Sequence, residues 1–226
     1  MKREANPIGG EIVIDRFSGI DFDPFVPFYI DIFYEHEPLA ECVGLSREHM
    51  DFITRTLYCG EKNLLSQALC WIARDSSRES RSVGIIACDD PVATGELEMP
   101  LGMDGEDMEK ISVITGLLEE VSRPMQEFFG QGEGICLHVA AIGVLHEYKG
   151  RGMAFRLLQA ALQEAKARGF KYAFSECTSP ASRKLHEKAG FHSINSISVS
   201  NYTINGRRPL PHCELDVHLM QKVLDG

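Results

Sequence analysis

The first part of the chain carries the hydrophobic patterns of both strands and helices. Residues 11–17, EIVIDRF, alternate apolar and polar positions and are rich in β-branched side chains, so they predict a strand. After a break at Pro38 a helical pattern runs to residue 58, and Ser46 is placed to cap a helix within it. Between these segments, residues 24–36 predict a helix whose apolar face holds Phe25, Phe28, Ile32 and Phe33.

Two strand-like apolar runs follow, at residues 68–75 and 81–90. The turn-like SSRES between them predicts an antiparallel hairpin. Residues 91–134 are a helical insertion, in which Pro124 should kink or end the helix. One face of that helix is apolar and holds Met108, Ile111, Ile114, Leu117, Leu118, Val121 and Met125.

The last part of the chain alternates strands with helices. Helices are predicted from the glycine-containing stretch near residue 150 to about Arg168, and over residues 179–190 between Ser179 as N-cap and Gly190. Strands are predicted over 135–145, 171–177, 196–204 and 213–223. This order is typical of an α/β protein with a partly parallel sheet covered by helices.

Composition narrows the class of protein. The 226 residues, 44% of them hydrophobic, can bury one sizeable core, so a single domain over residues 1–226 is expected. The formal net charge of -10 argues against a nucleic-acid partner and is compatible with a cationic small molecule. No apolar run approaches the roughly 20 residues that cross a bilayer, and the N-terminal stretch does not resemble a signal peptide. We therefore expect a cytoplasmic protein with no membrane partner, either a monomer or a homodimer.

The cysteines are scattered along the chain. None of the seven belongs to a CxxC pair or to a cysteine–histidine pair with zinc spacing, so no metal site is expected. Several lie in apolar runs, where a cysteine behaves as a small hydrophobic residue. The cysteines are therefore expected to be reduced thiols, as in a cytosolic protein.

The stretch YKGRGMA, residues 148–154, is the strongest candidate for a binding site. It lies between a predicted strand and a predicted helix, where several backbone N–H groups point one way and the helix dipole adds positive charge. Glycine lets the backbone approach a ligand closely, so the loop could wrap a pyrophosphate. A plain tight turn is the alternative on this stretch alone.

Two motifs resemble those of the GNAT N-acetyltransferases. VLHEYKGRGMAFRLL is similar to the acetyl-coenzyme A motif of that family, and SPASRKLHEKAGF resembles the next motif along the chain. Together they cover residues 135–191. EHEPLAE and ECTSPASRKLHEKAGF also resemble stretches of the insect arylalkylamine (dopamine) N-acetyltransferases.

The resemblance implies a fold, a reaction and a cosubstrate. It implies a GNAT fold, with a mixed sheet of about six or seven strands and helices on both faces. It also implies transfer of an acetyl group from acetyl-coenzyme A to a primary amine, in a ternary complex. The cosubstrate would contact Ile142, Gly143, Val144, Lys149, Gly150, Arg151, Gly152, Met153, Ala154 and Phe155.

Candidates for the chemistry come from both the resemblance and the residues themselves. The resemblance implies Glu37 as a base acting through water, assisted by the hydroxyls of Thr178 and Ser182. His138, in the strand before the loop, is a rival base, and its alternative role is a core histidine. His186 stands where many GNAT enzymes carry a tyrosine acid, and an imidazolium there could protonate a thiolate.

Further assignments stay open at this stage. A backbone N–H near residues 142–145 should stabilise the oxyanion, with Gly143 admitting the cosubstrate or marking a β-bulge. The amine is expected to be small and arylalkylamine-like or otherwise cationic. The alternatives are a protein or peptide amine, and a non-catalytic acyl-coenzyme A sensor on the same fold.

Overall fold

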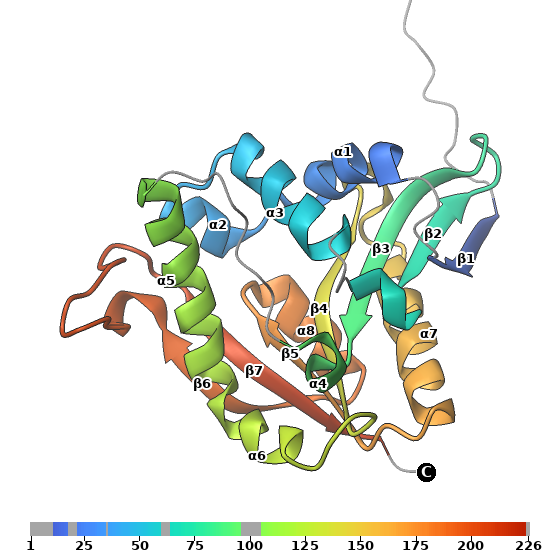
Figure 1. The fold of residues 1–226 in the computed structure, drawn as a ribbon. Helices are drawn as coiled ribbons and strands as arrows, with labels where there is room; N and C mark the ends of the chain where they lie inside the picture. Colours follow the sequence, from blue (N-terminus) through green and yellow to red (C-terminus); the bar gives the residue numbers. More distant parts are fainter. Residues whose placement is uncertain (1–10, 18–21, 35, 60–63, 96–104, 225–226) are drawn as a thin grey trace, which may run out of the picture.

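The computed structural model describes residues 11–17, 22–34, 36–59, 64–95 and 105–224. These residues form one twisted sheet with helices packed against it (Figure 1). Its seven strands lie in the order β1-β2-β3-β4-β5-β7-β6. The strands are β1 (Ile12–Arg16), β2 (Trp71–Asp75), β3 (Arg81–Asp89), β4 (Cys136–Val144), β5 (Tyr172–Cys177), β6 (His192–Ser198) and β7 (Asp216–Val223). The β4–β5 pair is parallel and every other neighbouring pair is antiparallel, so the sheet is mixed as expected.

Helices cover both faces of this sheet. They are α1 (Phe22–Phe33), α2 (Pro38–Val43), α3 (Arg47–Cys59), α4 (Pro91–Thr94), α5 (Gly105–Ser122), α6 (Gln126–Phe129), α7 (Met153–Ala167) and α8 (Pro180–Lys188). Short 3-10 turns lie at η1 (Leu64–Gln67), η2 (Arg123–Met125), η3 (His146–Tyr148) and η4 (Val199–Asn201). Helices α7 and α8 pack on one face, while α1 and α5 pack on the other (Figure 1).

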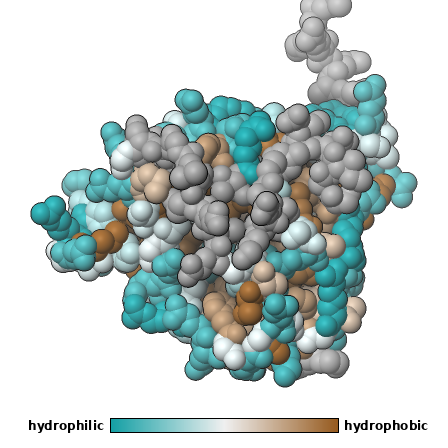
Figure 2. Space-filling model, in the orientation of Figure 1, coloured by the Kyte–Doolittle hydropathy of each residue, from teal (hydrophilic) through white to brown (hydrophobic). Residues whose placement is uncertain are grey.

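The alternation of side chains on β7 explains how α5 and α8 pack against opposite faces of the sheet. Val217 and Leu219 belong to the apolar cluster that includes Leu117 and Val121 of α5. Lys222, three residues beyond Leu219 and so on the opposite face of the strand, points to the end of α8, where its ammonium donates to the carbonyl of Ala189 over 2.9 Å. Polar residues cover much of the described surface around these layers (Figure 2), in keeping with the net charge.

Most predicted elements are present within a few residues of their expected bounds. The helix of the insertion ends at Ser122, and Pro124 lies in the 3-10 turn that follows, as its missing N–H predicts. Ser46 and Ser179 cap helices as expected, each accepting a backbone N–H three residues on. The strand predicted over 196–204 is wrong in its bounds, because β6 ends at Ser198 and a 3-10 turn follows.

A fork between β4 and β5 is the feature that positions the site. The two parallel strands pair at three positions, the last of which joins His138 to Phe174. Beyond that pair β4 continues to Val144 and β5 to Cys177, each without the other as a partner. A gap therefore opens in the middle of the sheet, between its two helical layers.

A β-bulge in β4 lies two residues beyond the last pair. Cys88 of β3 pairs with Val139 and Ala87 pairs with Ala141, so Ala140 is the extra residue. The bulge changes which face the following side chains meet: a Cβ at Gly143 would strike Ile32 and Phe33 of α1. A bulge at Gly143 was one of the two alternatives for that glycine, and the structure has the bulge at Ala140 instead.

The expectation of reduced cysteines is wrong at two positions. Cys42, in the last turn of α2, forms a disulfide with Cys213, which precedes β7, and their Cα atoms are 5.9 Å apart. The two residues are 171 positions apart in the sequence, so local spacing could not reveal the pair. Cys70, Cys88, Cys136 and Cys177 are buried thiols.

Among the helices that the structure describes, none combines the length and the apolar character needed to cross a bilayer.

Candidate active site

The glycine loop has the backbone of an anion cradle. Gly150 and Gly152 both have positive φ, of 77° and 71°, which glycine adopts without steric cost. Gly152 is the N-cap of α7 and supplies no side-chain acceptor, so the first N–H groups of that helix have no capping oxygen. A Cβ at either glycine would meet no heavy atom within 4 Å. The start of α7 therefore presents backbone N–H groups without a side-chain cap, next to open space, and these fit a pyrophosphate.

A buried tyrosine at the start of the loop fixes the loop to the protein core. Tyr148 is fully buried, and its hydroxyl donates to Asp75 Oδ2 over 2.7 Å. The guanidinium of Arg151 lies over its ring at 5.4 Å, while Lys149, Gly150, Arg151 and Gly152 are exposed. Tyr148 thus holds the backbone in place and leaves the cationic side chains at the surface.

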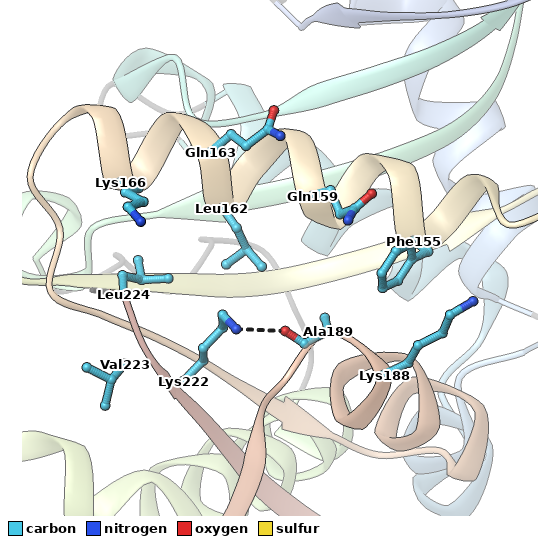
Figure 3. A pocket seen from close by; sticks show the side chains of 10 residues that line it. All are labelled: Phe155, Gln159, Leu162, Gln163, Lys166, Lys188, Ala189, Lys222, Val223 and Leu224. Atoms are coloured by element: carbon cyan, nitrogen blue, oxygen red, sulfur yellow. Dashed lines mark hydrogen bonds between the residues drawn. The ribbon is translucent and has the colours of Figure 1, made fainter. Parts of the chain in front are cut away.

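A groove continues from this loop along α7. It is lined by Phe155 and Gln159 of α7, by the end of α8 and by β7 (Figure 3), and its volume is about 440 Å³. Three lysines, Lys166, Lys188 and Lys222, border it, and the ammonium of Lys188 lies 4.7 Å from the centre of the Phe155 ring. In a chain of net charge -10, this cationic groove suits an anionic ligand.

Glu37 and Thr178 meet on the α1/α5 side, at the open end of β5. Thr178 follows the last residue of β5, and its hydroxyl donates to Glu37 Oε1. Glu37 is also the N-cap of α2, because its Oε2 accepts the N–H groups of Leu39 and Ala40 at 2.7 and 3.1 Å. The carboxylate is half-buried, and three donors fix its orientation.

Ser182 and His186 lie on the buried side of α8, next to a cysteine. The hydroxyl of Ser182 donates to Cys177 Sγ over 3.3 Å, and His186 Nδ1 lies 2.9 Å from the carbonyl oxygen of Ser182. His186 Nε2 has no hydrogen-bond partner. Because burial lowers the pKa of His186, the ring is neutral at pH 7, which does not favour it as an imidazolium acid.

His138 lies at the last paired position of the fork, between two carboxylates. Its Nδ1 is 3.0 Å from Asp89 Oδ1 and its Nε2 is 2.9 Å from Glu176 Oε2. Burial alone would lower the pKa of His138, but Glu176 and Asp89 outweigh it and raise this pKa to about 10. A histidine that stays protonated at neutral pH has no free nitrogen with which to accept a proton.

The remaining predicted contacts fall along β4 and the start of α7. Val144 lies close to Leu157 of α7, since both would meet a Cβ placed at Gly84, whereas Gly143 faces α1. Close packing of α1 is therefore one reason for a glycine at position 143. Met153 is buried beneath the first turn of α7, while Ala154 and Phe155 are half-buried beside the loop. Ile142 lies between the bulge and Gly143, and is also half-buried.

The structure groups the predicted residues at the two sides of the fork. Glu37 and Thr178 touch each other, and Ser182 touches neither of them in a hydrogen bond that the structure describes. Sequence reasoning missed Asp89 and Glu176. Both are charged residues inside apolar strand runs, and that signal could have identified them as members of a buried polar cluster. In the part of the chain that the structure describes, no set of histidine, cysteine and acidic side chains is arranged to hold a metal ion.

The sequence matches the profile of the family described as "Acetyltransferase (GNAT) family" over residues 67–191, which is more than half of the chain. That segment contains β3, the forked pair β4–β5, the glycine loop and α8. The match therefore covers the fork, the glycine loop and Thr178, whereas Glu37 lies outside it.

Several solved structures share the whole fold at low sequence identity. The C-terminal condensation domain of Ebony, in complex with beta-alanyl-dopamine, is 17% identical with a TM-score of 0.80 over 95% of this chain and 100% of that one. Arylalkylamine N-acetyltransferase 2 from Aedes aegypti is 17% identical with a TM-score of 0.73, covering 96% and 100% of the two chains. The polyamine N-acetyltransferase of Drosophila melanogaster, which forms N-acetylagmatine, is 19% identical with a TM-score of 0.69, covering 95% and 100%.

Proposed function

The chain belongs to the acetyltransferase (GNAT) family and is an acetyl-coenzyme A-dependent N-acetyltransferase; we propose that its acceptor is a small cationic amine, acetylated by direct attack in a ternary complex. The observation that carries the proposal is the fork. The glycine loop opens on the α7/α8 side of the sheet, and Glu37 lies at the open end of the fork on the α1/α5 side. A donor and an acceptor can thus approach one another from opposite faces.

The residues on the α7 side fit the cosubstrate. The uncapped N–H groups after Gly152 would hold the pyrophosphate, with Lys149 and Arg151 screening its charge. The cationic groove beyond Phe155 would receive the nucleotide end, whose phosphate suits Lys188. When bound, acetyl-coenzyme A supplies an activated acetyl thioester.

Glu37 is the best-placed base on the acceptor side. An alkylamine with a pKa of about 10.4 is almost fully protonated at pH 7, so a proton must be removed before it can attack. The Glu37 carboxylate can take that proton through a water, while the Thr178 hydroxyl keeps it oriented. Ser182, half-buried beside Cys177, would assist from the other side of β5.

The substrate class rests on charge and on the related structures. A surplus of acidic residues in the chain favours a cationic ligand. The structural relatives named above act on arylalkylamines and polyamines or hold a dopamine derivative, and these are small amines. A small amine of this kind is therefore favoured over a protein amine.

A route through an acetylated cysteine is not favoured. Cys177 and Cys136 are almost fully buried, and burial raises the pKa of each thiol to about 11. The thiolate is the nucleophile in such chemistry, and it is scarce at neutral pH for both residues. Direct attack of the amine needs no such intermediate.

The test is release of free thiol from acetyl-coenzyme A in the presence of arylalkylamines, polyamines, agmatine and short peptides. We expect turnover with a small-amine class and little with the peptides. Turnover confined to peptides would reject the substrate class. Tight cosubstrate binding without turnover on any amine would favour a sensor instead.

The same assay tests Glu37. Glu37→Gln keeps an oxygen that can cap α2 but removes the base, so kcat should fall about a hundredfold near pH 7 and less at high pH, where more amine is neutral. Affinity for acetyl-coenzyme A should stay the same. Glu41→Gln, an exposed carboxylate on the same helix, is the matched control. An unaltered pH–rate profile in Glu37→Gln would leave the residue as a helix cap only.

A further inference from the structure

A largely buried ion-pair network links the two strands of the fork to the neighbouring strand β3. Asp89 belongs to β3, His138 to β4 and Glu176 to β5, and the side chain of His138 contacts both carboxylates at 3.0 and 2.9 Å. Two further hydroxyls brace its ends: Thr94 donates to Asp89 over 2.6 Å, and Ser122 of α5 donates to Glu176. Each carboxylate is thus held by two partners.

The register makes the contact between His138 and Glu176 a diagonal side-chain link between the two strands. We call such a side-chain link between β4 and β5 a strut. His138 is in the last pair of the fork, opposite Phe174, while Glu176 lies two residues beyond that pair on β5. The contact therefore bridges β4 and β5 where they have already begun to separate. It limits how far apart the strands can stand on the α5 side.

A second strut closes the fork one residue beyond the last pair. The hydroxyl of Ser175 on β5 donates to the carbonyl oxygen of Val139 on β4 over 2.9 Å, and Ser175 is buried. The rings of His138 and Phe174, which form the last pair of the fork, stack with their centres 4.8 Å apart and fill the end where the two strands still pair. The first β4 residue past this point is the bulged Ala140, which is exposed.

We propose that Asp89, His138 and Glu176 act as positioning residues that fix the width and depth of the fork, and so restrict the enzyme to short acyl groups. The inference rests on the proposed function, because it places the acyl end of the cosubstrate between β4 and β5. A longer chain would have to push against the His138–Phe174 stack and the Ser175–Val139 bond.

The rigidity of these contacts is what would let the fork discriminate between acyl groups of different length. Side chains of a largely buried, paired network cannot move apart without leaving a charge with fewer partners, which is costly where little water can replace them. A rigid pocket discriminates one methylene by roughly 10- to 200-fold, whereas a pocket that yields discriminates less. Removing a strut should therefore weaken the preference for short acyl groups without affecting the glycine loop.

The experiment compares kcat/KM for acetyl-, propionyl- and butyryl-coenzyme A in the full-length protein. Glu176→Ala removes the diagonal strut, Glu176→Gln keeps its shape without the charge, and Ser175→Ala removes the second strut. The preference for acetyl over butyryl should fall at least about tenfold in Glu176→Ala and less in the other two. Glu187→Gln, an exposed carboxylate on α8, is the matched control and should keep the wild-type ratio.

Calorimetry separates failure of this inference from failure of the proposed function. If the wild type acetylates no amine, the proposed function fails, but the ratio of dissociation constants for acetyl- and butyryl-coenzyme A still reports the fork. An unchanged ratio in variants that remain folded and bind coenzyme A would overturn the inference and leave the network a purely structural role. If Glu176→Ala does not fold, Glu176→Gln and Ser175→Ala decide the question.

Discussion

Single residues at this site owe their chemical state to their neighbours. His138 and His186 have the same side chain, yet the pKa of one is raised by two carboxylates and that of the other is lowered by burial. Glu37 has a similar double character, since the carboxylate that would take a proton also caps α2. The chemical state of each group follows from its contacts, and for His138 these come from residues far away in the sequence.

The raised pKa of His138 predicts a pH dependence of stability. A histidine whose pKa is near 6.5 in the unfolded chain and about 10 when folded stabilises the protein fully below pH 6.5 and loses that effect as pH rises through 10. The free energy of unfolding of wild type should exceed that of His138→Asn by a few kcal/mol at pH 6, on the order expected for such a shift. The measurement is urea denaturation of both proteins from pH 6 to pH 10.

The difference between the two proteins should shrink steadily across this range. His212→Asn replaces an exposed histidine near the disulfide, and it is the control for the loss of a histidine outside the network. A difference that stays constant up to pH 10 would mean that His138 is not held protonated.

At the scale of elements, the site depends on where regular structure ends. The anion cradle lies where α7 begins, the candidate base where α2 begins, and the fork where β4 and β5 stop pairing. Backbone groups without regular partners are available to a ligand at such places. The bulge at Ala140 adds another irregularity beside the fork.

The start of α7 gives a prediction for cosubstrate binding. Gly152→Val forces a β-branched residue into positive φ and should lower affinity for acetyl-coenzyme A at least about tenfold by calorimetry, because the loop N–H groups would be displaced. Gly169→Val is the matched control. Gly169 has a φ of 88°, open space around its Cβ position and a place at the other end of α7.

The two glycine variants should lose similar stability but differ in binding. Each should cost on the order of 1–2 kcal/mol, the penalty for a side chain in the left-handed region. Equal affinity in both would contradict the role of the loop as an anion cradle.

The sequence predicted local elements well and long-range contacts poorly. The glycine loop and both capping serines were visible because a few neighbouring residues determine them. The contact of Glu37 with Thr178 came from resemblance to a family, since 141 positions separate the two residues. The pairing of His138 with Asp89 and Glu176 depends on strand order and register, and a shift of one residue would turn these side chains to the other face.

At the scale of the molecule, the disulfide joins segments from opposite ends of the chain. Cys42 lies in the helix that Glu37 caps, and Cys213 lies just before β7. Chain-entropy arguments assign up to about 5 kcal/mol to a bridge that closes so long a loop. The bridge therefore contributes to the free energy of unfolding of the whole fold.

Reduction should lower the urea midpoint of wild type to that of the double variant Cys42→Ser/Cys213→Ser. The double variant should not respond to reductant, which makes it the control for effects on other thiols. Without reductant, an alkylating reagent should modify neither Cys42 nor Cys213 even in urea. Modification of both under those conditions would show that the bridge does not form.

The same bridge makes most of the chain a covalent ring, with β1 and α1 on one tail and β7 on the other. A protease that cuts once between residues 42 and 213 would open this ring without releasing a fragment. Both pieces would remain one molecule, with the candidate base on one piece and β7 on the other. Covalent integrity of the protein would then depend on the redox state of its surroundings as well as on its peptide bonds.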